Sequence, residues 1–518
     1  MNLFNKTFQI TILTFFIVEL FSFCGYLVPA INVLVFCLLA LITLALTWKK
    51  LEYGLLIVLA ELFIGSKGYL FFLSCGEKII SLRLALWLIV MGVWFIKLVF
   101  TTLKTKKITF ALRESANFYY FLIFFFIIIF GIFNGVIHHH TSANIFFDAN
   151  GWLYLALIFP AYDVILKNSS QTIANILQVF TAAVFWLAIK TIFLVFAFSH
   201  NIGDLIFIIY RWVRESGVGE ITLIKGGFYR IFFQSHINVL VAFFLWLLIL
   251  ITNSTNKFLR IKNLSQKQLW LIAYLILTII FSVNLVNFSR SNWLGLIGGG
   301  LFLFIYLLFQ KKWRTASRLL IFTGSSFVIS IFIILLIVYF PWPQPIGGFN
   351  AAKLLSERAS ALTEEAGASS RWSLLPKLWS AIKNAPIVGQ GFGATITYQT
   401  SDPRILENNP NGLYKTYAFE WGWLDIWLKL GAIGMLYYIF LLAKIYFWDL
   451  YKSNFKNLIE INQPEKIIIL FFSLGMLVIS LVNISSPYLN HPLGFGYLVI
   501  SAAIIEKTIN NKKGIKAE

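Results

Sequence analysis

The residues with the clearest chemical potential are two arginines that lie beside long apolar segments. Arg290 belongs to the short polar run 287–292, and Arg230 belongs to the run 226–238 that leads into another apolar segment. An arginine at the edge of an apolar segment is unfavourable unless it is paired or faces water. Its planar guanidinium matches the oxygens of a phosphate group, so the two positions predict an anion clamp. A simple interfacial arginine is the alternative at each position.

A third arginine begins an amphipathic stretch. Arg371-Trp372 is followed by leucines, a tryptophan and Ile382 at a spacing typical of a helix with one apolar face. The run 386–393 comes next, with glycine at alternate positions. Alternating glycines that follow a helix are weak grounds for a phosphate site. A tight turn that needs positive φ is the favoured interpretation of this run.

Glu420 is the carboxylate best placed for acid–base chemistry. It begins the largely apolar stretch that extends to Gly434. A carboxylate that is partly removed from water has a raised pKa and can accept a proton, so Glu420 is a candidate base. Asp425 and Lys429 lie one helical turn apart in the same stretch, and an ion pair between them is the simpler interpretation.

Histidine offers two further candidates. His236 begins the apolar segment after Arg230, where it is either a polar ligand or part of a capped helix entry. The triplet His138–His140 does not direct three imidazoles to one face, so no metal site is predicted from it.

The composition says what kind of protein must position these residues. Hydrophobic residues make up 59% of the 518 residues and charged residues only 12%, with a mean hydropathy of +0.80. A soluble domain has about 25% charged residues. The chain is therefore neither an ordinary soluble enzyme nor a disordered or fibrous protein, and a polytopic membrane protein remains.

Apolar runs along the chain predict its architecture. A bilayer core of about 30 Å requires about 20 apolar residues for each helix, and about 14 runs meet that need. Their centres extend from Phe16 to Val499. We predict an all-α polytopic membrane protein with about 12 to 14 transmembrane helices and one long, partly helical outer loop.

The net charge of +20 is explained by this arrangement. Basic residues recur in every second connection, as the positive-inside rule requires for cytoplasmic loops. We therefore expect both termini in the cytoplasm and membrane lipids as partners. Binding to nucleic acid, the other common reason for a basic chain, is not expected.

The predicted spans divide the chain into five parts. They are N-terminal transmembrane helices (1–198), an outer loop with an amphipathic segment at Asp204–Val213 (199–236), further transmembrane helices (237–340), the long outer, periplasmic loop (341–420), and C-terminal transmembrane helices with a basic cytoplasmic tail (421–518).

The order of these motifs resembles that of the O-antigen ligase/polymerase superfamily of membrane glycosyltransferases. The resemblance covers about residues 226–434, and the earlier spans share only their apolar character. It rests on the following features: Arg230 with His236 and Asn238 before a span, Ser289-Arg290-Ser291 at the start of a span, Arg371-Trp372 and the run 386–393 in a long outer loop, and Leu424-Asp425 with Gly431 and Gly434 in the next helix.

The resemblance implies a GT-C-like fold in the bacterial cytoplasmic (inner) membrane. Family members act at the outer face, where they move a glycan from an undecaprenyl-type polyprenyl diphosphate to an acceptor hydroxyl. The acceptor is a lipid A core sugar for ligases and another lipid-linked glycan for polymerases. Such a reaction needs no cofactor, because the donor already carries its leaving group.

The resemblance also implies roles for particular residues. Arg230 and Arg290 match the arginines that hold the diphosphate, so catalysis would be independent of a metal, and Arg371 is a third arginine of this kind. Glu420 stands where ligases carry histidine, and this departure favours a polymerase over a ligase. Trp372 and Tyr417 offer faces for sugar rings, although interfacial anchoring is an equal alternative.

A secondary transporter or a lipid-linked glycan flippase is the main competing interpretation. Charged residues within apolar spans, such as Glu19, Lys97 and Lys190, are features that transport would use. The sequence has no clear internal repeat of the kind common in transporters, and the candidate residues lie on the outer side.

Overall fold

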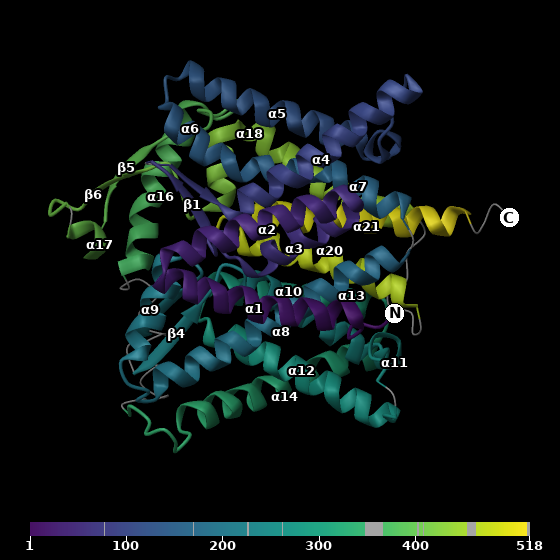
Figure 1. Ribbon diagram of the computed structural model, residues 1–518, viewed down its shortest axis with the longest axis vertical. Coiled ribbons are helices and arrows are strands. Elements are labelled where there is room, and N and C mark those ends of the chain that lie inside the picture. The colour runs from purple at the N-terminus through teal and green to yellow at the C-terminus, as the bar shows by residue number, and fades with distance from the viewer. Residues whose placement is uncertain are drawn as a thin grey trace.

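The computed structural model describes the chain except for residues 77, 169, 225–226, 262, 348–365, 401–402, 408, 453–462 and 515–518. Its long helices lie side by side and run between two ends of a bundle (Figure 1). Both termini lie at one end. The other, here named the loop-rich end, carries the described residues within 65–81, 138–149, 200–235, 287–289, 366–421 and 483–491. Part of the predicted long loop, 348–365, and residues 515–518 of the predicted basic tail are outside the described residues.

The first half of the chain contributes seven main helices to the bundle. They are α1 (Lys6–Leu27), α2 (Pro29–Lys49), α3 (Leu51–Ile64), α4 (Leu82–Thr105), α5 (Phe118–Ile137), α7 (Ile158–Lys167) and α8 (Ser170–Ser199). Their connections contain β1 (Phe72–Cys75), β2 (Lys78–Ser81), η1 (Ala111–Glu114), α6 (Ser142–Ala149) and η2 (Asn150–Leu157).

The described residues of the second half contribute seven more. They are α10 (His236–Ile251), α12 (Gln266–Val286), α13 (Arg290–Phe309), α14 (Trp313–Val338), α18 (Gly422–Ala443), α20 (Pro464–Val482) and α21 (Pro492–Gly514). Their connections contain α9 (Leu205–Glu215), β3 (Glu220–Ile224), β4 (Phe228–Phe232), α11 (Thr255–Phe258), α16 (Ala366–Asn384), β5 (Ile396–Gln399), α17 (Pro403–Leu406), β6 (Leu413–Thr416), η3 (Lys444–Trp448) and α19 (Asp449–Lys452).

These elements confirm the predicted fold class. Within the described residues, 12 helical segments are long and apolar enough to cross a membrane. The strands there form three separate antiparallel pairs and no larger sheet. The apolar runs around Leu59 and Phe244 fall on α3 and α10, which are shorter than these 12 segments. The protein is an all-α, multi-pass membrane protein.

Helix α10 forms the centre of the second half of the bundle. All of its residues are buried, and it packs against α8, α12 and α20. Outer helices have the opposite character: Leu41 on α2 and Phe332 on α14 are each 63% exposed. Apolar side chains exposed along such helices form the surface that lipid tails would cover.

Two amphipathic predictions are borne out at the loop-rich end. The stretch Asp204–Val213 corresponds closely to α9, which buries Trp212 and exposes Phe207. The stretch after Arg371 forms α16, whose apolar face buries residues at helical spacing. The buried residues of that face are Leu374, Leu378 and Ile382.

The glycine-rich run 386–393 supports a break in α18. Gly431 has φ +69° and ψ −179°, so the helical hydrogen bonds stop there. The run supplies replacements: Gln390 N–H donates to the Leu428 carbonyl (2.7 Å), Gly391 N–H to the Lys429 carbonyl (3.0 Å) and Ala432 N–H to the Pro386 carbonyl (2.9 Å). Backbone groups at membrane depth need such internal partners. The positive-φ interpretation of the run is confirmed, and its role is to support this broken helix.

Replacing Gly391 with alanine is expected to destabilise the protein. A Cβ at this position would lie 2.0 Å from the backbone nitrogen of Gly135, and φ here is +80°. A side chain forced into such a place lowers the unfolding free energy by more than about 1 kcal/mol. The melting temperature of the detergent-solubilised protein measures this change.

Gly300→Ala is the matched control. A Cβ on Gly300 meets no atom within 4 Å, and alanine favours a helix interior over glycine by about 1 kcal/mol. Gly300→Ala should therefore melt at or above the wild-type temperature. Equal melting temperatures for the two variants would contradict the proposed fit of Gly391.

Candidate functional site

Three arginines from three separate elements approach one another at the loop-rich end. Arg230 on β4 donates from Nε to the carbonyl of Asn287 at 2.8 Å. Asn287 lies in the turn that leads directly to Arg290, the first residue of α13. Arg290 in turn is near enough to Arg371 of α16 to influence its ionisation. Sequence positions far apart are thus joined into one basic site.

The electrostatics of Arg371 reflect this crowding. Burial lowers its pKa, the nearby positive charge of Arg290 lowers it further, and Glu220 opposes both effects. A guanidinium stays charged under such shifts. Arg371 Nε also forms an ion pair with Glu420. Among the described residues, Glu220 and Glu420 are the carboxylates found to act on Arg371, and both favour its charged form.

Local structure explains how the first two arginines are held. Ser289 caps α13 and accepts a hydrogen bond from the Asn292 amide (3.4 Å), which fixes Arg290 in the first helical turn. The antiparallel register of β3 and β4 pairs Arg230 with Thr222. The guanidinium of Arg230 lies 4.9 Å from the ring centre of Phe232.

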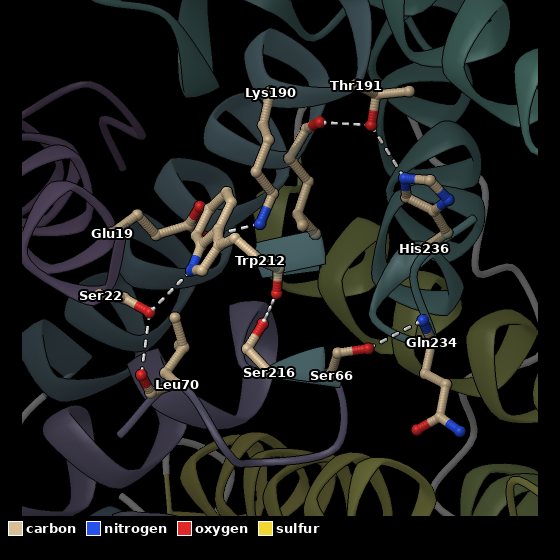
Figure 2. A network of polar contacts seen from close by, with 11 residues as sticks. Glu19, Ser22, Ser66, Leu70, Lys190, Thr191, Trp212, Ser216, Gln234 and His236 are labelled. Atoms are coloured by element: carbon tan, nitrogen blue, oxygen red, sulfur yellow. Dashed lines mark hydrogen bonds and ion pairs between the residues drawn. The ribbon is translucent and has the colours of Figure 1, made fainter. Parts of the chain in front are cut away.

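A buried polar network holds the connection between β4 and α10 against neighbouring helices (Figure 2). Gln234 N–H donates to Ser66 Oγ at 3.1 Å, which ties this connection to the loop after α3. Lys190 of α8 pairs with Glu19 of α1 at 2.6 Å, and Lys190 Nζ lies 4.5 Å from the ring centre of Phe233. The strand that carries Arg230 is therefore anchored by groups within the bundle.

His236 belongs to the same network. Its Nδ1 accepts from the amide of Phe233 (3.3 Å), so a neutral ring carries its proton on Nε2. Nε2 lies 2.9 Å from Thr191 Oγ1, which itself donates to the Leu187 carbonyl (Figure 2). Both ring nitrogens are engaged and the residue is fully buried. These contacts favour a structural role for His236 over the predicted contact with substrate.

Trp372 and Glu420 both lie next to Arg371, one in sequence and the other through an ion pair. Trp372 is 53% exposed and packs edge-on against Trp421, whose Nε1 donates to the Arg371 carbonyl (3.0 Å). Glu420 is 51% exposed and pairs with Arg371. The sequence predicted a partly desolvated carboxylate at this position, and the structure differs because the end of the loop leaves Glu420 open to solvent.

A second charged cluster lies under the first turns of α18. Lys429 Nζ lies 2.6 Å from Asp425 and 2.5 Å from Asp148 of α6, and all three side chains are buried. The other oxygen of Asp148 accepts from Gly393 N–H (2.9 Å). The expected Asp425–Lys429 pair is confirmed. Sequence reasoning missed Asp148, whose only signal is a lone acid just before an apolar span.

This cluster borders a cavity of about 290 Å³. Tyr417 lines the cavity, and burial together with the nearby carboxylate of Asp148 raises its pKa. The phenol is therefore neutral at physiological pH. Of the predicted site residues, Tyr417 thus lies with the second cluster, whereas Arg230, Arg290, Arg371, Trp372 and Glu420 lie around the arginine site.

The turn between α20 and α21 connects the two places. Ser486 Oγ is 2.9 Å from Ser291 Oγ, beside Arg290. Four residues later, Asn490 donates to Asp425 at the cavity. The cavity and the arginine site are therefore neighbouring parts of one polar region.

The remaining intramembrane charges that transport would use have partners. Lys190 and Glu19 neutralise each other, as described above. Lys97 donates to the carbonyls of Thr47 and Trp48 at the end of α2, at 3.1 and 2.8 Å. These contacts explain the three charges as structural features.

The fold and the site together define a multi-pass membrane protein with an arginine-rich polar region at one end of its bundle. Residues 274–439 match the family model described as O-antigen ligase. The match covers less than half of the chain; it supports the O-antigen ligase/polymerase superfamily and, in broad terms, a membrane glycosyltransferase of that kind. A comparison with curated proteins finds no match. The matched segment includes Arg290, Arg371 and Glu420, and Arg230 lies before it.

Proposed function

We propose that the protein transfers glycan from an undecaprenyl-diphosphate carrier to a sugar hydroxyl at the outer face of the bacterial cytoplasmic membrane. The acceptor is a second lipid-linked glycan in the favoured, polymerase form of the reaction, and a lipid A core sugar in the ligase form. The proposed orientation places the loop-rich end outside and both termini in the cytoplasm.

One observation carries this proposal: Arg230, Arg290 and Arg371 come from three elements to a single basic site. A departing diphosphate develops negative charge as the bond to the sugar breaks, and fixed cationic donors lower the energy of that state. Guanidinium groups make paired hydrogen bonds to phosphate oxygens without a metal ion. The site therefore has the charge and donors that this leaving group needs.

Glu420 is the proposed base in this reaction. The acceptor oxygen attacks the anomeric carbon of the donor sugar, and the bond from that carbon to the diphosphate oxygen breaks with its electron pair. The acceptor proton passes to the carboxylate. Arg371, the ion-pair partner of Glu420, would hold the carboxylate beside the leaving group. The solvent exposure of Glu420 allows an acceptor to approach from the loop-rich end.

The experiment is a gel of surface glycans from cells that lack the protein, with and without plasmid-borne variants. Wild-type protein is expected to restore the glycan, whereas Arg230→Ala should fail to do so at equal membrane expression. Normal glycan with Arg230→Ala would contradict the proposed role of the arginine site.

The pattern in cells without the protein separates the two reactions. Single repeat units on the anchor indicate a polymerase, and bare anchor with accumulated lipid-linked chains indicates a ligase. Unchanged glycan together with altered uptake of a solute would instead support a transporter. Broken helices are common in transporters, so the break in α18 is the structural feature that supports this alternative.

A further inference from the structure

We propose that the cavity under the start of α18 is the acceptor subsite and that it selects an uncharged sugar ring. This inference rests on the proposed function and adds the place and chemical class of the acceptor. Its volume of about 290 Å³ is at the small end of the usual range for small-molecule pockets, as expected for a subsite that holds part of a glycan.

The charges around the cavity balance. Lys67, Arg83 and Lys429 are opposed by the carboxylates of Asp148, Asp425 and of Glu61, the buried partner of Arg83. A balanced cavity offers no net attraction to a charged group, and an unpaired charge brought into it would lose water without gaining a partner. The cavity therefore suits a neutral ring.

The lining suits a sugar in two further ways. Aromatic side chains provide flat apolar faces, and polar groups fix orientation, the usual division in small-molecule pockets. The aromatic lining residues are Tyr69, Trp87, Phe147, Tyr154, Tyr417 and Phe419. Trp87 Nε1 and the Tyr154 hydroxyl are buried without a hydrogen-bond partner among the described residues. A ligand rich in hydroxyls could supply such partners.

His491 adds a neutral polar group to the lining. Burial, together with the positive charges of Arg83 and Lys67, lowers its pKa to about 3. Its Nδ1 accepts from the Leu493 amide at 3.3 Å, so the proton of the neutral ring is on Nε2. The ring therefore contributes an N–H donor and no charge.

The position of the cavity fits an acceptor. Residues Tyr417, Ala418 and Phe419 line it, and the next residue, Glu420, pairs with Arg371 at the arginine site. A ring in the cavity would thus lie across one short loop from the proposed base. The α20–α21 turn connects the same two places, as its contacts with Ser291 and Asp425 indicate.

Kinetics of the full-length protein in nanodiscs test this inference. The donor is lipid-linked glycan extracted from cells that lack the protein, and the acceptor, varied separately, is oligosaccharide released by mild acid from the same glycan. Tyr417→Ala is expected to raise the KM for the acceptor about tenfold, the equivalent of one lost stacking contact, and to leave the donor KM within about twofold. Tyr119→Ala, an exposed tyrosine far from the cavity, should change neither. An unchanged acceptor KM, or an equal rise in both KM values, overturns the inference.

A binding assay tests the sugar site without relying on glycan transfer, so the inference and the proposed function can fail separately. Ala418→Cys is introduced after Cys24, Cys37 and Cys75 are replaced by serine, and its rate of maleimide labelling is measured. Oligosaccharide released by mild acid from the cells' own glycan should slow labelling, and the same material with its primary hydroxyls oxidised to carboxylates should not. Protection by neither or by both overturns the inference, even if transfer proceeds. If transfer is absent but protection is observed, the proposed function fails and the uncharged-sugar site stands.

Discussion

Arg290→Ala should reduce glycan transfer by about a hundredfold to a thousandfold, the usual effect of removing one charge-stabilising donor from an active site. Arg290 begins α13 directly after the Ser289 cap, and Arg230 is bound to the turn just before it. Loss of the guanidinium removes charge stabilisation from the departing diphosphate and should lower kcat. The measurement is initial rate with purified protein and extracted lipid-linked donor.

Two further variants serve as controls for this expected loss of rate. Arg290→Lys keeps the charge without the planar fork and should recover only part of the rate. Arg318→Ala removes an exposed arginine from α14, near the opposite end of the bundle, and should leave the rate unchanged. Full activity in Arg290→Ala, with the protein folded and monodisperse, would refute a catalytic role for this arginine.

Lys190→Met is expected to be the most destabilising of the single changes considered. It leaves the carboxylate of Glu19 buried without its partner, since both side chains of the pair are only 4–6% exposed. Breaking a buried ion pair from one side typically lowers the unfolding free energy by about 3–5 kcal/mol. Thermal unfolding in detergent measures the loss.

The double variant Glu19→Gln with Lys190→Met distinguishes charge from packing. If the single variant suffers from an isolated charge, neutralising Glu19 should restore most of the lost stability. The pair also anchors the β4–α10 connection through Phe233, so activity should return with stability. A double variant as unstable as Lys190→Met would show that methionine does not fit the site.

Several features of this protein were determined by its sequence alone. Scarce charges and long apolar runs leave only a membrane-spanning helical fold, because a bilayer admits no unpaired backbone. The helical spacing after Arg371 predicts α16, and the i,i+4 spacing of Asp425 and Lys429 predicts their ion pair, which the structure has at 2.6 Å. These features depend on residues close together in the chain, and the spacing of such residues can be read from the sequence.

The tertiary structure decided how the candidate residues are grouped. Arg230, Arg290 and Arg371 come from one strand and two helices, and only the packing of those elements brings them together. Nothing in the spacing of Asp148 indicates that it meets Lys429, more than 250 residues away in the chain. Long-range contacts of this kind depend on which helices are neighbours.

The sequence alone also did not predict which candidate side chains are exposed to solvent and which are hydrogen-bonded in the interior. The same polar residue type can face water, substrate or a buried partner, and the fold selects among these. Glu420 is open to solvent beside Arg371, whereas His236 is buried with both nitrogens engaged. Tyr417 lies at the cavity of Asp148 and Asp425, apart from the arginines. The sequence thus specified the membrane fold and the kinds of groups available, and tertiary packing determined which groups share a site, because their neighbours come from distant segments.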